Sequence, residues 1–529
     1  MSDDIAAQAA RRRTFAVISH PDAGKSTLTE ALLLHARAIG EAGATHGKAG
    51  RKATVSDWME MEKDRGISIS SSAVQFRHHD AVMNLVDTPG HADFSEDTYR
   101  VLTAVDSAVM LLDAGKGLET QTMKLFEVCR SRRIPIITVI NKWDRPGHDA
   151  LALFDEIESR TGLRPTPITW PVGIAGHFHG VIEVATGDFI RFTRTPGGST
   201  LSGADRMDAA AAHRLVGDDW DRAVEEVSLL ASDDYAHNQA AFEEQRTTPV
   251  LFTAAALNFG VGHLLDTLAR LAPAAGSRPD AVGSRRAVTA GFSAQVFKVQ
   301  AGMDRSHRDR LAFARVNSGM FHRGEVITHE PTGRAFATKY VHSVFGRDRD
   351  TIEVAYPGDI IGLVNAGDVR AGDTLYSGEA VAFPKIPAFA PEHFRVANAK
   401  DVSRYKQFQR GMTQLDQEGV IQVLYSDHRT RRSPVLAAVG PMQFEVVTHR
   451  MEREFGAAVH LETLPYTFAL RTTADDAPVI DRRAGVEVAT REDGVHLALF
   501  TDKWQVSGVR RDHPSIVLEP IVSGTIDAS

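Results

Sequence analysis

A glycine, a lysine and a hydroxyl occur in residues 19–26 in the order that phosphate-binding loops use. Gly24 allows backbone N–H groups to close around phosphate oxygens. Lys25 can offer its charge to the β and γ phosphates, and the Ser26 hydroxyl can ligate Mg²⁺. We therefore expect a nucleotide to bind along the whole loop, which comprises Ser19, His20, Pro21, Asp22, Ala23, Gly24, Lys25, Ser26 and Thr27.

A second run of candidate residues consists of Asp87, Thr88, Pro89, Gly90 and His91. An aspartate at a strand end can hold Mg²⁺ through water, as Asp87 is expected to do. Gly90 can offer its N–H to a γ-phosphate, and loss of that phosphate would release the segment that follows. His91 alone would more often be a turn residue. The phosphate loop upstream favours a catalytic role for it.

A third run, Asn141, Lys142, Trp143 and Asp144, is suited to recognising a base. The Asp144 carboxylate can accept hydrogen bonds from guanine N1–H and the 2-amino group, whereas adenine offers no such pair of donors. Two mismatches at roughly 1–3 kcal/mol each give about 10²- to 10⁴-fold discrimination. Asn141 can tie this segment to the phosphate loop, and the Lys142 stem can lie over the base. The three runs, in this order, predict a GTPase rather than an ATPase or a nucleotide kinase.

A fourth contact to guanine is expected from the backbone of Ala254, Ala255 and Ala256, which follow the strand-like residues 249–253. The match to the usual Ser-Ala pattern is weak. On its own this segment would be interpreted as the start of a helix.

Short apolar strands must position these residues. Residues 14–18, 84–86 and 134–140 are predicted buried strands, and residues 27–38 a helix with one apolar face. Each of the first three runs follows a strand, at the sheet edge where open α/β sheets bind ligands.

Composition excludes several classes of protein. The 529 residues contain 43% hydrophobic residues, which argues against disorder. The one cysteine, Cys129, cannot form a disulfide within the chain, and no apolar run is long enough to cross a bilayer. We expect a cytoplasmic protein with no membrane association. The net charge of −8 argues against general binding of polyanions but allows a local basic face.

The chain resembles the translational GTPases and, among them, the peptide chain release factor 3 family. The matching segments include residues 13–27, 56–70, 84–100, 298–316 and 439–447, and the resemblance extends to about residue 465. Ser68 supports the assignment, because elongation factors usually carry threonine there. The resemblance implies that Ser68 and Ser26 ligate Mg²⁺, that Asp87 holds the metal's water, and that His91 places the attacking water. Ser26 stands where the family usually has threonine.

The resemblance also implies partners and an activity. It implies a ribosome-dependent GTPase that binds GTP or GDP with Mg²⁺ and stimulates dissociation of class I release factors after peptide release. We expect a monomer that contacts ribosomal RNA and proteins. Basic residues at 305–310 and at Arg429, Arg431 and Arg432 could contact RNA phosphates, although solvated loops would show the same residues.

The remaining sequence predicts the architecture. Residues 1–278 are expected to form an α/β P-loop G domain with an insertion near 174–247. Short alternating strands in residues 279–387 predict an all-β barrel, and residues 388–529 an α+β C-terminal domain. Three alternatives stay open: another ribosomal GTPase, of the elongation factor G-like or ribosome protection type, a metabolic enzyme that couples GTP hydrolysis to nucleotidyl transfer, and a passive binding module.

Overall fold

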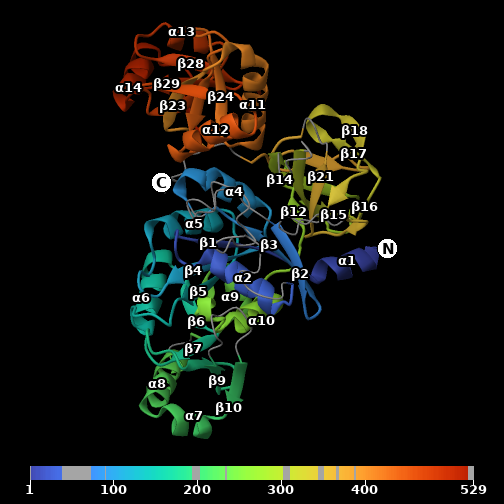
Figure 1. The fold of residues 1–529 in the computed structure, drawn as a ribbon. Helices are drawn as coiled ribbons and strands as arrows, with labels where there is room; N and C mark the ends of the chain where they lie inside the picture. The colour runs from blue at the N-terminus through green and yellow to red at the C-terminus, as the bar shows by residue number, and fades with distance from the viewer. Residues whose placement is uncertain are drawn as a thin grey trace.

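The structure is a computed structural model. It describes residues 2–38, 73–89, 91–193, 203–232, 235–301, 310–342, 351–364, 369–386 and 389–521. Figure 1 shows the α/β part in the middle, a β-rich part beside it, and the C-terminal part above. The predicted fold classes of all three parts are confirmed, whereas the expected boundaries at 278 and 387 stay a prediction.

The α/β part is built on one sheet in which the described strands follow the order β2-β3-β1-β4-β5-β11-β6. Only β2 runs antiparallel to its neighbour, β3, and the other pairs are parallel. The strands are β1 (Arg12–Ser19), β2 (Ala73–His78), β3 (Ala81–Asp87), β4 (Ser107–Asp113), β5 (Ile136–Asn141), β6 (Arg164–Pro167) and β11 (Thr247–Phe252).

Helices cover both faces of this sheet. One face carries α2 (Lys25–His35) and α10 (Val261–Leu271), whose leucines pack with Phe15 and Val17 of β1. The other face carries α4 (Ser95–Thr103), α5 (Thr120–Ser131) and α6 (Ala150–Thr161), which pack with Ala16 and Ile18. Alternate residues of β1 thus enter opposite cores, as expected for a central parallel strand. The shorter helices are α1 (Ser2–Ala10), η1 (Ala92–Phe94), α9 (Gln239–Glu243) and η3 (Ala255–Leu257).

A small sheet and the helices α7 (Ala209–Val216), α8 (Asp218–Ser232) and α9 lie between β6 and β11, where the chain returns to the main sheet. The strands β8 (Gly180–Glu183) and β9 (Asp188–Thr193) form a hairpin in this sheet, whose order is β10-β9-β8-β7. The other strands are β7 (Thr169–Val172) and β10 (Gly203–Met207). Trp170 of β7 anchors α8, since it is buried and donates to Glu226 of that helix at 2.7 Å.

The β-rich part is a curled antiparallel sheet around one apolar core. Its described strands run in the order β18-β17-β22-β14-β15-β21-β19, and β16 pairs with β20 beside them. They are β14 (Ser293–Ala301), β15 (Arg310–Ser318), β16 (Phe321–His322), β17 (Val326–His329), β18 (Arg334–Ala337), β19 (Val341–His342), β20 (Val354–Ala355), β21 (Ile360–Val364) and β22 (Thr374–Tyr376). A short ladder of β12 (Arg278–Pro279) and β13 (Arg285–Arg286) and the turn η4 (Glu330–Thr332) complete it.

The C-terminal part has one sheet with helices, in the order β26-β23-β25-β24-β28-β29-β27-β30. The strands are β23 (His393–Ala399), β24 (Gln422–Ser426), β25 (Val435–Ala438), β26 (Val459–Thr463), β27 (Phe468–Thr472), β28 (Glu487–Arg491), β29 (His496–Phe500) and β30 (Glu519–Pro520). The helices are η5 (Val402–Arg404), α11 (Tyr405–Glu418), α12 (Met442–Arg453), α13 (Ala477–Asp481) and α14 (Lys503–Asp512). Residues after 465 therefore extend this sheet. None of the described helices in the chain is long and apolar enough to cross a membrane.

A buried ion pair joins the β-rich part to the α/β part. The Arg315 guanidinium, on β15, donates to both carboxylate oxygens of Asp106, at 2.9 and 2.7 Å, and to the Ala104 carbonyl at 3.0 Å. Arg278 donates to the same carboxylate at 3.1 Å. The Arg315 side chain is only 2% exposed, so water does not replace these hydrogen bonds and the buried charges depend on each other.

Replacing Arg315 with methionine should leave the Asp106 charge buried with only part of its hydrogen bonding. We expect R315M to lose about 3–5 kcal/mol of stability, measured as a lower urea midpoint of unfolding. The control is R323M, which removes an exposed pair with Glu353 in the same part of the chain and should cost at most about 1 kcal/mol. Equal midpoints for the two variants would show that the Asp106 pair does not fasten these parts together.

Candidate functional site

The predicted phosphate loop connects β1 to α2 at the carboxyl edge of the main sheet. Asp22 and Gly24 adopt positive φ angles of 67° and 99°. A Cβ on Gly24 would lie 2.6 Å from Asn141 Nδ2, so a side chain is excluded there by contact as well as by backbone conformation. The loop therefore needs glycine at this position to pack against the base-recognition segment.

Lys25 and Asp87 form a buried ion pair at the start of α2. Lys25 Nζ lies 2.6 Å from Asp87 Oδ1, and the two side chains are 7% and 2% exposed. Asp87 Oδ2 and Ser19 Oγ are buried without a hydrogen-bond partner in the described part of the chain. Burying such atoms is costly unless a ligand or water satisfies them. This set of groups suits a phosphate chain with a hydrated Mg²⁺, because a cation and an acceptor with free lone pairs lie side by side.

The remaining phosphate-loop residues line the entrance. His20 donates its N–H to Thr122 Oγ1 at 3.1 Å, and its Nε2 lies 3.3 Å from Glu119. Pro21 and Ser26 are half-buried, Ala23 is buried, and Thr27 is exposed. Glu119 and Thr122 were not predicted from the sequence, because neither belongs to a recognisable motif. Thr122 lies on α5, and Glu119 is the residue before that helix.

Asn141 links three segments of the site. Its Nδ2 donates to the Ala23 carbonyl at 2.9 Å, which is the tie to the phosphate loop that the sequence suggested. Its Oδ1 accepts from Thr253 Oγ1 at 3.1 Å and from the Ala255 N–H at 3.0 Å. The side chain thus uses donor and acceptor sides together, which fixes the orientation of the amide.

Lys142 reaches across the same edge. Its φ of 64° turns the chain so that Nζ donates to the Asp22 carbonyl and to Asp113 Oδ2, the latter at 2.8 Å. Burial alone would raise the pKa of Asp113, but the hydrogen bonds from Lys142 and from the Gly115 N–H hold that pKa below its usual value. Asp113 was not predicted as a site residue from the sequence. It does end the strand-like run 107–113, and an acid at the end of a strand can indicate a ligand site.

Asp144 offers a carboxylate free for a ligand. It is half-buried, and none of the described residues forms a hydrogen bond or an ion pair with it. Its neighbour Trp143 is 1% exposed, packs edge-on against Phe252 with ring centroids 4.8 Å apart, and donates to the Gly173 carbonyl at 3.2 Å. The buried indole therefore anchors the segment that presents Asp144 at the surface of the site.

The Ala254–Ala256 segment lies against this loop, at the point where β11 ends. Its residues begin the short helix η3, which agrees with the expectation of a helix start. Ala254 and Ala255 are buried and Ala256 is exposed. The Ala255 N–H is already donated to Asn141.

The residues after Asp87 lead to the C-terminal part. Thr88 donates its hydroxyl to the Val17 carbonyl at 2.7 Å, and the Pro89 carbonyl lies 3.4 Å from Thr98 Oγ1. His91 Nδ1 lies 3.3 Å from both the backbone N and Oδ1 of Asp93. Gly90 and Ser68, which were expected to sense the γ-phosphate and to ligate Mg²⁺, lie outside the described residues.

Asp93 forms a contact that sequence reasoning did not find. Its Oδ2 accepts the Met442 N–H at 2.7 Å, at the start of α12, and a Cβ on Gly440 would lie 2.2 Å from Asp93 Cγ. Phe94 packs with Val446 of the same helix. The segment beside His91 is therefore fastened to the C-terminal part. No pattern within either segment signals this pairing, because it joins residues 349 positions apart.

Comparison with known proteins decides the family. A family model of the elongation factor Tu GTP binding domain matches residues 10–274, one of elongation factor G domain 2 matches residues 291–378, and one of the class II release factor RF3 C-terminal domain matches residues 383–510. A peptide chain release factor 3 from Gloeobacter violaceus is 43% identical over 98% of both chains. Another, from Symbiobacterium thermophilum, is 44% identical over 97% of this chain and 98% of its own.

The chain belongs to the peptide chain release factor 3 family. It is accordingly a translational GTPase of termination that binds guanine nucleotide and interacts with the ribosome. The C-terminal match separates this release factor family from the elongation factor G-like and metabolic alternatives. A solved structure from Thermus thermophilus shares the fold, with a TM-score of 0.69 at 20% identity over 91% of this chain and 73% of the other.

Replacing Asn141 tests whether its side-chain amide holds the nucleotide site of this release factor 3 family member together. Asn141→Ala leaves the Ala23 carbonyl and the Ala255 N–H without partners, at about 1–3 kcal/mol for each group. We expect guanine nucleotide affinity to fall by at least about tenfold in a titration with fluorescent GDP.

The matched control for that variant is Gln245→Ala. Gln245 also bridges two carbonyls through its amide, at Cys129 and Ile134, but away from the loops. It should leave nucleotide affinity unchanged. If Asn141→Ala binds GDP as tightly as the control does, the amide bridge does not shape the site.

Proposed function

We propose that this chain hydrolyses GTP with Mg²⁺ at the carboxyl edge of β1, β3 and β5, and that the resulting change of conformation drives class I release factors off the ribosome after peptide release. The proposal rests above all on the Lys25–Asp87 pair, whose unpartnered Oδ2 lies where a hydrated cation beside phosphates is needed. We further propose that the chain acts as a monomer in the cytoplasm.

Each phosphate-site residue has a role in this proposal. The backbone N–H groups of Gly24 and of the first residues of α2 face the phosphates, where the helix N-terminus adds its dipole. Lys25 turns from Asp87 toward the β and γ phosphates. Ser26 and Ser68 would ligate Mg²⁺ directly, and Asp87 through water. Bound Mg²⁺ would offset the negative charge of the phosphates.

The base is recognised by the segment that Asn141 holds in place. Asp144 accepts from guanine N1–H and the 2-amino group, the Lys142 stem lies along the base, and the backbone of residues 254–256 closes the other side. The free, half-buried Asp144 carboxylate supports this assignment. A buried acceptor left facing the adenine N1 lone pair would be repelled, which gives the preference for guanine.

His91 is the proposed catalytic residue. Its Nδ1 lies against Asp93, which leaves Nε2 as the ring nitrogen that can bind the attacking water. The water oxygen attacks the γ-phosphorus, the bond from that phosphorus to the bridging oxygen breaks so that this oxygen stays with GDP, and phosphate leaves with the oxygen and the protons of the water. Positioning by an activator is worth about 10³- to 10⁵-fold in related phosphoryl transfers, and here the ribosome is the proposed activator.

The nucleotide state is proposed to reach the other parts of the chain through residues 91–103. Asp93 bonds to Met442, and Arg100 reaches the Glu418 carbonyl at 3.5 Å. Lys298 of β14 lies 3.8 Å from Asp97. One short segment therefore touches both parts that follow the G domain. A shift of this segment when Gly90 gains or loses its γ-phosphate contact would alter their positions.

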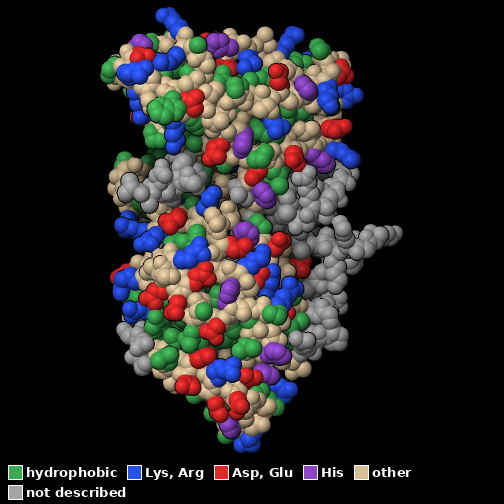
Figure 2. Space-filling model, turned by 90° about the vertical axis from the view of Figure 1, so that its left-hand side faces the viewer, with side chains coloured by type: hydrophobic (Ala, Val, Ile, Leu, Met, Phe, Trp, Pro, Cys, Tyr) green, Lys and Arg blue, Asp and Glu red, His purple; other side chains and the backbone are tan. Residues whose placement is uncertain are grey.

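The basic cluster on the C-terminal part has internal partners. Arg429 pairs with Glu487 at 3.1 Å, and the guanidinium groups of Arg431 and Arg432 lie over the rings of Tyr425 and Tyr405. These contacts favour a structural role over RNA binding. Residues 305–309 of the other cluster lie outside the described residues, and its last member, Arg310, donates to the Val369 carbonyl at 2.7 Å. Figure 2 shows acidic and basic side chains mixed over one face, so a ribosomal surface there would consist of separate contacts rather than one basic field.

Asp144→Asn tests the base recognition. The amide presents a donor where xanthine has its 2-oxo acceptor, so affinity should shift from GTP to xanthosine triphosphate. We expect GTP to bind about 10²- to 10⁴-fold more weakly in competition with a fluorescent nucleotide. Asp149→Asn, which keeps the cap of α6 in the same loop, serves as the control. An unchanged preference for GTP in D144N would refute the role given to Asp144.

His91→Ala tests the catalytic assignment. The ring is 35% exposed, so its loss should leave the fold and GTP binding intact. Ribosome-stimulated turnover, measured as phosphate release, should fall by about 10²- to 10⁴-fold. His148→Ala, an exposed histidine in the base loop, should retain full turnover. Full stimulated turnover in H91A would remove His91 from the mechanism.

A further inference from the structure

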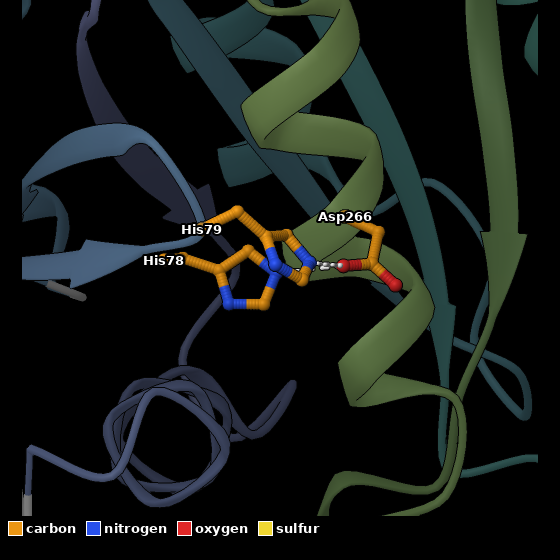
Figure 3. A group of neighbouring side chains, drawn as sticks. All are labelled: His78, His79 and Asp266. Atoms are coloured by element: carbon orange, nitrogen blue, oxygen red, sulfur yellow. Dashed lines mark hydrogen bonds and ion pairs between the residues drawn. The ribbon is translucent and has the colours of Figure 1, made fainter.

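Three side chains of the kinds that bind metal ions lie close together at the end of the main sheet away from the phosphate loop. His78 is the last residue of β2, His79 begins the turn to β3, and Asp266 lies on α10 (Figure 3). The Nε2 atoms of His78 and His79 lie 2.6 and 3.1 Å from the same oxygen, Asp266 Oδ1. The three ligand atoms all lie within 4.8 Å of one another.

The turn itself brings the two rings together. Neighbouring residues of a strand normally point to opposite faces. His79 instead has a φ of 49°, a left-handed conformation that few residues adopt, and the pairing of His78 with Ala81 leaves a two-residue turn. As a result the ring centroids lie 4.1 Å apart, and Figure 3 shows both rings directed at one carboxylate.

The donor set selects a class of metal. Two imidazole nitrogens and a carboxylate oxygen suit zinc and its first-row neighbours, whereas Mg²⁺ and Ca²⁺ prefer oxygen ligands. Zinc needs each donor at about 2.0–2.2 Å, so an ion between the rings requires the carboxylate to move aside slightly. Asp266 and His79 have room to adjust, because their side chains are 60% and 73% exposed. His78 is only 16% exposed and gives the site a fixed ligand.

A cleft of 880 Å³ adjoins this group. His78, His79 and Asp266 all line it, and Arg11 and His263 are among the other lining residues. Three protein ligands leave one position of a tetrahedral ion open, and that position would be reached from the cleft. A water or a small anionic ligand could therefore complete the coordination.

We propose that His78, His79 and Asp266 bind one divalent transition-metal ion of the zinc class. The site is separate from the nucleotide, since β3 begins at the turn beside His79 and ends at Asp87 of the phosphate site. The ion ties the β2–β3 turn to α10. It therefore holds the edge strand β2 and the central sheet to the helix that covers them.

The test uses the full chain without an affinity tag, saturated with GDP and Mg²⁺ so that the nucleotide site is occupied. Titration with Co²⁺ should give one equivalent with the visible absorption of a tetrahedral nitrogen and oxygen site. Zn²⁺ should displace it, and a large excess of Mg²⁺ should not. Zn²⁺ should also raise the melting temperature by a few degrees.

His79→Gln and Asp266→Asn should each weaken Co²⁺ binding at least tenfold. Both residues are exposed, so the fold should survive. The control is His213→Gln, which removes an exposed histidine from a 2.9 Å contact with Asp221 and should bind Co²⁺ like the unchanged chain. The proposal is overturned if no stoichiometric Co²⁺ binds, if excess Mg²⁺ displaces it, or if H79Q and D266N bind it as H213Q does.

Discussion

The side chain of Asn141 contacts segments that lie as much as 118 residues away in the chain, and the shape of the nucleotide site depends on these contacts. The parallel strands β1, β5 and β11 end at one edge, so their loops are neighbours but not yet aligned. One amide then fixes the phosphate loop to the base segment by its donor side and to residues 253–255 by its acceptor side. Gly24 has to be glycine because this amide packs against it.

The same edge is connected to the rest of the molecule by polar contacts. Asp93 holds the start of α12, and Asp106 holds Arg315 of the β-rich part. Both aspartates flank α4, which follows the residues expected to sense the γ-phosphate. Such contacts are specific in direction and can be exchanged for others at small net cost, unlike a large apolar interface. They suit the proposed change in the positions of these parts with the bound nucleotide.

Much of this site is local in sequence and was therefore predictable. A phosphate loop needs its glycine, lysine and hydroxyl within eight or so positions, and a buried parallel strand such as β5 is a plain apolar run. Asp113 could have been selected as an acid at a strand end, but its contact with Lys142 was not predictable, and neither were the contacts of Asp93 and of the His78–His79–Asp266 group. Each depends on which residues the fold brings together over long separations, and a single acid or histidine carries no signal of its partner. Arg429 illustrates the same limit, because its charge suggested RNA whereas its position pairs it with Glu487.

The central claim is that GTP bound at this edge is used to remove class I release factors from the ribosome. The most direct measurement is the rate at which a labelled class I factor leaves post-termination ribosomes after this chain is added with GTP or with GDP. The account predicts much faster departure with GTP than with GDP or with nucleotide alone. Equal departure rates in all three mixtures, while the same ribosomes stimulate GTP hydrolysis by the chain, would contradict it.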